Sequence, residues 1–516
     1  MLELDLRAIF LFTGLASALC LSGPGALMAK PAQLHLSTES DPRTSITAAF
    51  KLNWESSELR CRLGTLPGFY DEWVQPRISP APNEDSSWVY SASFENLSPG
   101  TRYYYQCGGD RVGWSLERSF RTALAGPDGE FVLTYWGDQG TSDAARGLVS
   151  HVATYVKPDL HIHAGDLAYA NGNPARWDDW FEIIAPLAST TPYMTVQGNH
   201  DLEGELEDST YLGRLALPGN ECWYSFRWNG VHFTMLDTQK YFTPGSDQVD
   251  WILADLASAA ADPTVRWMVL VCHKPPYSAG PIHGSVPELR LVIGNLCDSY
   301  GVDLALTAHE HTYERTYPIL GERVTDHCDD CVDPEGTVYL VSGGASPSQH
   351  KAQREYWTAT SGNALHFTKV EFEAGRTLHI SAAGIRNSGV PSRLDRASIT
   401  WNSGRRELDA VEAPEGYSVA DSYGLVGGVI RAFRWPSEGN QHLRDLFRAH
   451  GQEVMGILSE NAPAPGERPQ GGAGLEEALV GALRPDAGPE LLRALECLDG
   501  APMPGESQAS LVENSS

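Results

Sequence analysis

Basic residues are scarce in this chain of 516 residues. It holds 38 Lys and Arg against 66 Asp and Glu, which gives a formal net charge of −28 at pH 7. A nucleic-acid backbone or an anionic membrane would be repelled by a protein of this charge. The composition therefore argues against those partners. Any anionic ligand has to be attracted by a local positive charge such as a bound metal ion.

A hydrophobic run long enough to cross a bilayer is missing at the N-terminus. The apolar run of residues 9–22 is shorter than the roughly 20 residues that a membrane-spanning helix needs, and small residues follow it up to Ala29. This pattern predicts a secretory signal peptide over residues 1–29 and a secreted or periplasmic protein without stable membrane insertion. Because two early acidic residues offset Arg7, an uncleaved anchor is the alternative.

Cysteine is also infrequent, with nine in the whole chain, one of which, Cys20, lies in the predicted signal peptide. The remaining even number permits disulfides in an exported protein. Cys61 and Cys107 lie in two predicted strands of one small β domain and are the favoured pair. Cys328 and Cys331 form a Cys-Asp-Asp-Cys loop that can close locally. Half of a zinc site is the alternative for that loop, but no second pair of matching spacing follows.

Short polar strings between residues 137 and 315 are the most informative feature of the sequence. They are Gly137–Gly140, Gly165–Tyr169, Gly198–Asp201, Val271–His273 and Ala308–Arg315. Most of them follow an apolar run of strand character: 131–136, 160–163, 193–196, 267–271 and 303–307. In an open α/β sheet, functional groups gather beyond the carboxyl ends of the strands. We therefore expect the strings to converge at one place.

The strings offer two sets of metal ligands and one carboxylate to share between them. The first set includes two hard anionic oxygens and suits a trivalent ion, whereas the second offers neutral oxygen and imidazole donors and suits a divalent ion. The first set is Asp138, Tyr169 and His311, the second is Asn199, His273 and His309, and the shared carboxylate is Asp166. Two ions about 3.5–4 Å apart are the usual arrangement for in-line phosphoryl displacement.

The order and composition of these strings resemble the purple acid phosphatases, a branch of the calcineurin-like metallophosphoesterase superfamily. The resemblance implies Fe(III) in one site and Fe(II), Zn or Mn in the other. The Fe(III) ligands would be Asp138, Asp166, Tyr169 and His311, and the ligands of the divalent ion would be Asp166, Asn199, His273 and His309. It further implies an acid phosphatase that hydrolyses phosphate monoesters by attack of a metal-bound hydroxide, with a tyrosinate-to-iron charge-transfer colour.

The chain departs from the family pattern at two positions. Ala308 stands where the family usually has glycine, and a methyl group there could crowd the turn that presents His309. Asn171 stands close to where the family often has aspartate, shortly after the tyrosine. Neither departure removes a ligand, so they bear on substrate preference and rate more than on metal binding.

Two further histidines are candidates for catalytic roles. His200 follows the ligand candidate Asn199, and imidazole can carry a proton near neutral pH, so we expect it to protonate the leaving alcohol or steady the phosphoryl group. His283, ten residues beyond His273, lies where the family often places a second substrate histidine. A solvated loop histidine is the alternative for His283.

Residues behind the site are expected to support the ligands. The candidates are Asp201, which ends the third string, and Glu314 with Arg315, which end the fifth.

The remaining sequence predicts the domain organisation. Residues 30–125 contain short alternating runs and turns typical of an all-β module, and resemble a fibronectin type III domain. Residues 128–401 resemble the double-sheet α/β/β/α metallophosphoesterase domain, with helical apolar spacing at Gln248–Leu256 and Leu289–Cys297. Residues 402–516 form an extension for which a partly helical appendage and a poorly ordered acidic tail are both compatible with the sequence.

Three other functions fit parts of this pattern. A phosphodiesterase or nucleotide pyrophosphatase would use the same ligands. A related Fe/Ca-dependent alkaline phosphatase is disfavoured because Tyr169 and the His-x-His string match the purple branch better. An exported binding protein with a vestigial phosphatase domain would not need every ligand. In each enzymatic case the partner is a small phosphoester, and the sequence leaves the oligomeric state open.

Overall fold

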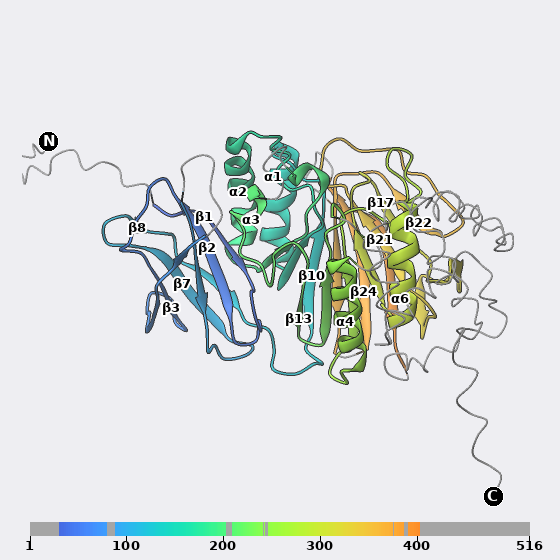
Figure 1. Ribbon diagram of the computed structural model, residues 1–516, viewed down its shortest axis with the longest axis horizontal. Coiled ribbons are helices and arrows are strands. Elements are labelled where there is room, and N and C mark those ends of the chain that lie inside the picture. Colours follow the sequence, from blue (N-terminus) through green and yellow to red (C-terminus); the bar gives the residue numbers. More distant parts are fainter. Residues whose placement is uncertain are drawn as a thin grey trace, which may run out of the picture.

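The computed structural model describes residues 30–402, apart from 80–87, 203–208, 241, 243–245, 375 and 386–390. The predicted signal peptide and almost all of the predicted extension therefore lie outside the described residues. Figure 1 shows a small β domain joined to a larger α/β domain. Within the part of the chain that is described, no helix is both long enough and apolar enough to cross a bilayer.

The N-terminal domain consists of two antiparallel sheets packed face to face. One sheet has the order β1-β2-β6-β5 and the other β4-β3-β7-β8, with β9 also paired to β7. The strands are β1 (Ala32–Ser37), β2 (Ile46–Leu52), β3 (Arg60–Gly64), β4 (Glu72–Val74), β5 (Arg77–Ile78), β6 (Trp88–Phe94), β7 (Arg102–Gly109), β8 (Gly113–Trp114) and β9 (Arg118–Arg121). A disulfide joins Cys61 on β3 to Cys107 directly opposite on β7, which confirms the predicted pairing.

The larger domain is built on two seven-stranded mixed sheets. The first has the order β12-β11-β10-β23-β24-β25-β20 and the second β13-β14-β15-β16-β21-β17-β22. The first sheet contains β10 (Phe131–Trp136), β11 (Leu160–His163), β12 (Tyr193–Thr195), β20 (Asp330–Val332), β23 (His366–Phe372), β24 (Thr377–Ile385) and β25 (Pro391–Thr400). The second contains β13 (Tyr224–Trp228), β14 (Val231–Met235), β15 (Trp267–Val271), β16 (Leu304–Thr307), β17 (Tyr313–Thr316), β21 (Val338–Ser342) and β22 (Thr358–Gly362).

Helices cover the outer faces of these two sheets (Figure 1). The first sheet is covered by α1 (Asp143–His151) and α2 (Pro174–Ala188), which share its apolar core. The second is covered by α4 (Asp247–Ala261), α5 (Pro287–Leu289), η4 (Arg290–Gly294) and α6 (Asn295–Tyr300). Both predicted helices fall inside these elements. The resulting order of helix, sheet, sheet and helix confirms the predicted fold class.

Local sequence explains why the central strands and helices form where they do. β15 reads Trp-Met-Val-Leu-Val and is buried along its whole length, as expected for a parallel strand with neighbours on both sides. Helix α4 begins after Ser246, whose side chain accepts a hydrogen bond from the Val249 N–H and so satisfies one free donor at the helix start. β10 pairs in parallel with β11 and β15 with β16, so the carboxyl ends of the strands in each pair lie side by side.

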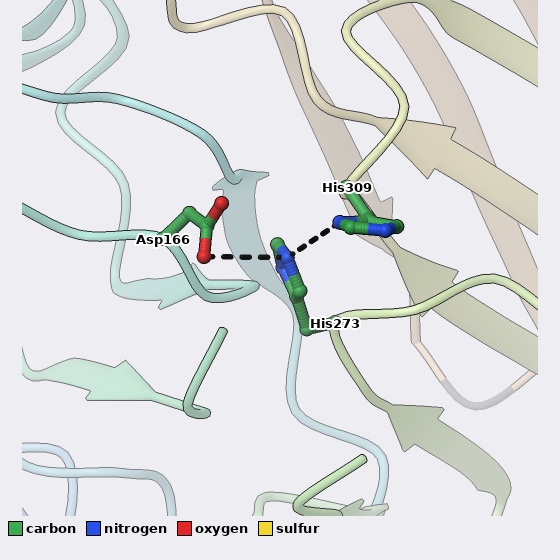
Figure 2. Close-up of side chains that lie close together, drawn as sticks. All are labelled: Asp166, His273 and His309. Carbon is green, nitrogen blue, oxygen red and sulfur yellow. Dashed lines mark hydrogen bonds and ion pairs between the residues drawn. The ribbon is translucent and has the colours of Figure 1, made fainter. Parts of the chain in front are cut away.

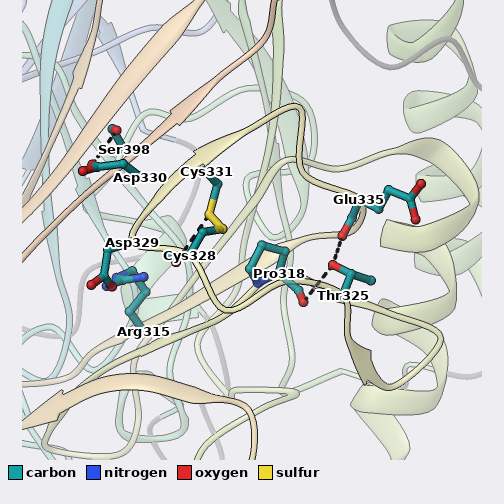
Figure 3. Close-up of a disulfide and its surroundings, with 9 residues drawn as sticks. All are labelled: Arg315, Pro318, Thr325, Cys328, Asp329, Asp330, Cys331, Glu335 and Ser398. Atoms are coloured by element: carbon teal, nitrogen blue, oxygen red, sulfur yellow. Dashed lines mark hydrogen bonds and ion pairs between the residues drawn. A yellow bond between two sulfur atoms is a disulfide. The ribbon is translucent and has the colours of Figure 1, made fainter.

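A buried ion pair connects the two sheets away from those strand ends. Arg315 on β17 donates from Nε to Asp395 Oδ2 on β25 at 2.6 Å, and Tyr313 also donates to Asp395 Oδ2, at 2.7 Å. Arg315 additionally reaches Asp329 at 2.7 Å, in the loop closed by the Cys328–Cys331 disulfide (Figure 3). The disulfide confirms the local closure expected of that loop.

Replacing Asp395 with alanine should destabilise the larger domain strongly. The substitution removes the buried partner of Arg315, and breaking a buried pair typically costs about 3–5 kcal/mol. Asp329→Ala is the matched control because it removes the other partner of the same arginine, and its side chain is 67% exposed. That control should lower the free energy of unfolding by no more than about 1 kcal/mol. Urea unfolding of both variants measures the two free energies of unfolding. Equal losses would contradict the assignment of Asp395 as the main stabilising partner of Arg315.

Candidate metal centre

Left-handed backbone turns present four of the predicted ligands. Asp138, Asp166, Tyr169 and His309 have φ angles of 59°, 54°, 50° and 69°. Residues other than glycine adopt this region rarely, and such strain collects at functional sites. Asp138, Asp166 and His309 lie within three residues of the ends of β10, β11 and β16. The chain therefore turns sharply at each strand end and projects a polar side chain there.

The first predicted set comes together in the structure. The Tyr169 hydroxyl lies 3.3 Å from Asp138 Oδ1 and 3.3 Å from His311 Nε2. His311 Nε2 is 3.5 Å from Asp138 Oδ1, so the three donor atoms form a small triangle. The other Asp138 oxygen accepts the backbone N–H of His309 at 2.8 Å, which ties this set to the second one.

The second set gathers beside it around Asp166. Asp166, His273 and His309 each offer a ligand atom within 4.8 Å of the others (Figure 2). His273 Nε2 lies 3.4 Å from Asp166 Oδ1 and 3.1 Å from His309 Nδ1. Asn199 Oδ1 is 3.2 Å from the same His273 nitrogen. Several lone-pair donors thus point into one space, as the ligands of a cation do.

Hydrogen bonds behind the site fix the orientation of two imidazoles. His273 Nδ1 lies 2.8 Å from the carbonyl oxygen of Ala164, and His311 Nδ1 lies 2.7 Å from that of Ser348. Because a carbonyl oxygen only accepts, each Nδ1 donates its N–H to the carbonyl, and each Nε2 is directed at the site. This donor set of carboxylate, phenol, amide and imidazole groups fits two metal ions.

The electrostatics of the site favour added positive charge. Burial and then the His273 ring lower the pKa of His309 to about 2, so its imidazole stays neutral and free to bind a cation. Burial opposes protonation of His311, but its hydrogen bond with Asp138 raises the pKa to about 9. Burial, followed by the Asp138 and Asp166 carboxylates, raises the pKa of the Tyr169 phenol. A tyrosinate therefore requires a strong cation beside it.

The Asp201 carboxylate lies behind the turns that carry two of the predicted ligands. Its carboxylate accepts the backbone N–H groups of Asp166, Leu167 and Gly198 at 2.8, 2.9 and 2.8 Å. These bonds lock the turn that carries Asp166 against the turn that carries Asn199.

Glu314 and Arg315 have a different role from the one expected. Glu314 accepts the Ala279 N–H at 2.7 Å and the Thr358 hydroxyl at 2.7 Å, while Arg315 binds Asp395. Both side chains lie on β17 and hold neighbouring strands and loops, because the strand carries them past the turn in which the ligands sit.

Three glycines leave room beside the predicted ligands because they have no side chain. A Cβ atom at Gly198 would lie 2.1 Å from Asp166 Oδ1, and one at Gly165 would lie 2.6 Å from His273 Nδ1. A Cβ atom at Gly137 would lie 2.4 Å from the Ala308 methyl. The space beside Gly137 therefore accommodates Ala308, where the family usually has glycine.

Both predicted catalytic histidines lie at the centre. The His200 ring is exposed and lies 4.6 Å from the Tyr169 ring, while its backbone N–H donates to Asp166 Oδ1 at 2.9 Å. The His283 ring stacks on His309 at 4.0 Å. Burial lowers the pKa of His283.

Two residues at the centre were not predicted, namely Glu310 and His350. Glu310 is fully buried and its carboxylate lies 2.8 Å from His350 Nδ1, whose ring stacks on His311 at 4.4 Å. The position of Glu310 between two ligand histidines was a signal in the sequence. His350 follows a Ser-Pro-Ser-Gln stretch, and the sequence around it does not indicate a functional role.

Two protein-family models match this chain. The family model for the purple acid phosphatase N-terminal domain matches residues 31–122, and the model for calcineurin-like phosphoesterases matches residues 135–313. The likeness of the first domain to fibronectin type III stays a prediction.

Relatives of known family cover most of the described chain. Purple acid phosphatase 18 of Arabidopsis thaliana is 29% identical over an alignment of 346 positions that covers 63% of this chain and 73% of that protein. Human acid phosphatase type 7 is 26% identical over an alignment of 393 positions that covers 69% of this chain and 88% of that protein.

A solved structure shares the fold. Purple acid phosphatase from yellow lupin seeds matches with a TM-score of 0.64 and 21% identity, over 73% of this chain and 75% of that one. The two matched family models and the relatives above support the assignment of this chain as a metal-dependent acid phosphatase of the purple acid phosphatase type, and the solved structure shows the shared fold.

Proposed function

We propose that this protein is a secreted acid phosphatase that hydrolyses phosphate monoesters at the centre described above. The observation that carries the proposal is the convergence of two ligand sets around Asp166. Fe(III) would be held by Asp138, Asp166, Tyr169 and His311, and a divalent Fe, Zn or Mn ion by Asp166, Asn199, His273 and His309. The two anionic oxygens of the first set support the trivalent ion there.

The protein side chains bind and orient the substrate around these ions. When bound, the two cations supply Lewis acidity and lower the pKa of the attacking water. His200 lies at the exposed edge of the centre, where its ring can reach the leaving oxygen and hold a proton for it. His283 lies over His309 on the other side and can contact the phosphoryl oxygens.

Secretion is part of the proposal. The leader-like residues 1–29 and the two disulfides support an oxidising compartment outside the cytosol. We assign the N-terminal domain to residues 30–125 and the catalytic domain to residues 128–401.

A direct test compares para-nitrophenyl phosphate with bis-para-nitrophenyl phosphate as substrates of the purified protein. We expect the monoester to be hydrolysed faster at acidic pH. Asp166→Ala should lower that rate by more than about 100-fold and release metal, since even outer residues at metal sites contribute about 10–100-fold. His379 is an ion-paired histidine on β24, and His379→Ala is the matched control. This control variant should retain both the hydrolysis rate and the bound metal. Full turnover by Asp166→Ala would rule out the dinuclear assignment.

Replacing Tyr169 with phenylalanine should remove the visible colour of the protein. A tyrosinate bound to Fe(III) gives a broad charge-transfer band, and phenylalanine lacks the oxygen that forms it. Absorption spectra before and after a mild reductant measure the band, and elemental analysis of the same samples shows whether iron is still bound. A colourless wild type that contains only zinc or manganese would contradict the Fe(III) assignment.

A further inference from the structure

Four imidazole rings form a continuous row that bridges the two ligand sets. His311 of the first set stacks on His350 at 4.4 Å, and His350 lies 5.6 Å from His283. His283 in turn stacks on His309 of the second set at 4.0 Å. The two middle rings, His350 and His283, belong to neither predicted ligand set. They therefore connect His311 of the first set to His309 of the second.

A single buried carboxylate holds both middle members of the row. Glu310 Oε1 lies 2.8 Å from His350 Nδ1, and Glu310 Oε2 accepts the backbone N–H groups of His283 and Gly284 at 2.7 and 3.1 Å. The Glu310 side chain is fully buried, whereas the His350 side chain is 15% exposed. The Glu310 carboxylate is thus inside the protein, while the His350 side chain is partly open to solvent.

The surrounding backbone is shaped to admit this carboxylate. A Cβ atom at Gly280 would lie 2.1 Å from Glu310 Cγ, so the loop that carries His283 closes on Glu310 only because residue 280 is glycine. His350 is also fixed by its backbone, since its N–H donates to the His311 carbonyl oxygen at 3.0 Å. The His350 ring and the backbone that carries His283 are thus held in place before any substrate arrives, which reduces the entropy lost on binding.

We propose that His350 is a substrate-binding residue that contacts the phosphate group through its Nε2 edge, and that Glu310 is the positioning residue for His350 and His283. This inference rests on the proposed function, because a phosphate ester spanning both metals would lie beneath the row of rings. His350 adds a second contact on the side of His311, opposite the contact that His283 makes on the side of His309.

The experiment measures binding of inorganic phosphate to metal-loaded protein by calorimetry, with metal content determined on the same samples. His350→Ala should weaken phosphate binding about 10-fold, the effect of losing one hydrogen bond to a charged group. The metal content should stay at the wild-type level. His350→Gln should recover part of the affinity, because the amide offers both a donor and an acceptor. His379→Ala is the control and should bind phosphate like the wild type.

Unchanged phosphate affinity in His350→Ala with full metal content would overturn the proposal. Loss of metal in both the alanine and the glutamine variant would overturn it as well, since the ring would then serve only to hold His311. Failure of the wild type to hydrolyse any monoester would refute the proposed function instead. The calorimetric result tests the phosphate contact separately from turnover.

The role of Glu310 is tested by a double-mutant cycle. Glu310→Ala should weaken phosphate binding at least as much as His350→Ala, because it releases both rings. The double variant should bind no worse than Glu310→Ala alone, since His350 acts only when Glu310 positions it. Glu310→Gln keeps the shape of the side chain. It replaces Glu310→Ala in the cycle if the alanine variant does not fold. Additive losses in the cycle would show that the two residues act independently and would overturn the positioning role.

Discussion

The left-handed turns at the strand ends are the constraint on which the centre depends. In an extended conformation, Asp138, Asp166 and His309 would continue the direction of their strands. Each left-handed residue costs about 1–2 kcal/mol in backbone strain. Buried hydrogen bonds offset that strain, above all the three backbone N–H groups that donate to Asp201. Asp201 is fully buried behind the centre, and the geometry of the Asp166 and Asn199 turns depends on it.

Much of the centre could be predicted because its signals are local in the sequence. Asp138, Asp166 and His273 each follow a short, mostly buried strand rich in apolar and aromatic or imidazole side chains, and the end of such a run marks the end of a strand. Parallel strands then bring those ends to one place without further information. The Cys61–Cys107 disulfide was predictable for a similar reason, since both residues lie in strands of one small domain.

The remaining features depend on contacts that leave no local pattern. His350 reaches the centre through a loop whose path is set by the backbone bond to His311. Arg315 was expected to support a ligand, but its partner Asp395 lies 80 residues further along the chain on another sheet. Ala308 fits because Gly137, on a different strand end, has no side chain in its way. Each of these requires knowledge of which segments meet in space.

Each ligand set draws its members from both sheets. Asp138 and Asp166 follow strands of the first sheet, whereas His273 and His309 follow strands of the second. A cation held in this way acts as a cross-link between the two layers, in addition to their apolar packing, the Arg315–Asp395 pair and the hydrogen bonds of Ser342 with His366 and Thr368. Because the cation binds only the assembled layers, its binding free energy adds to the free energy of unfolding. Metal supply in the compartment would then govern how long the protein survives proteolysis, apart from how fast it turns over substrate.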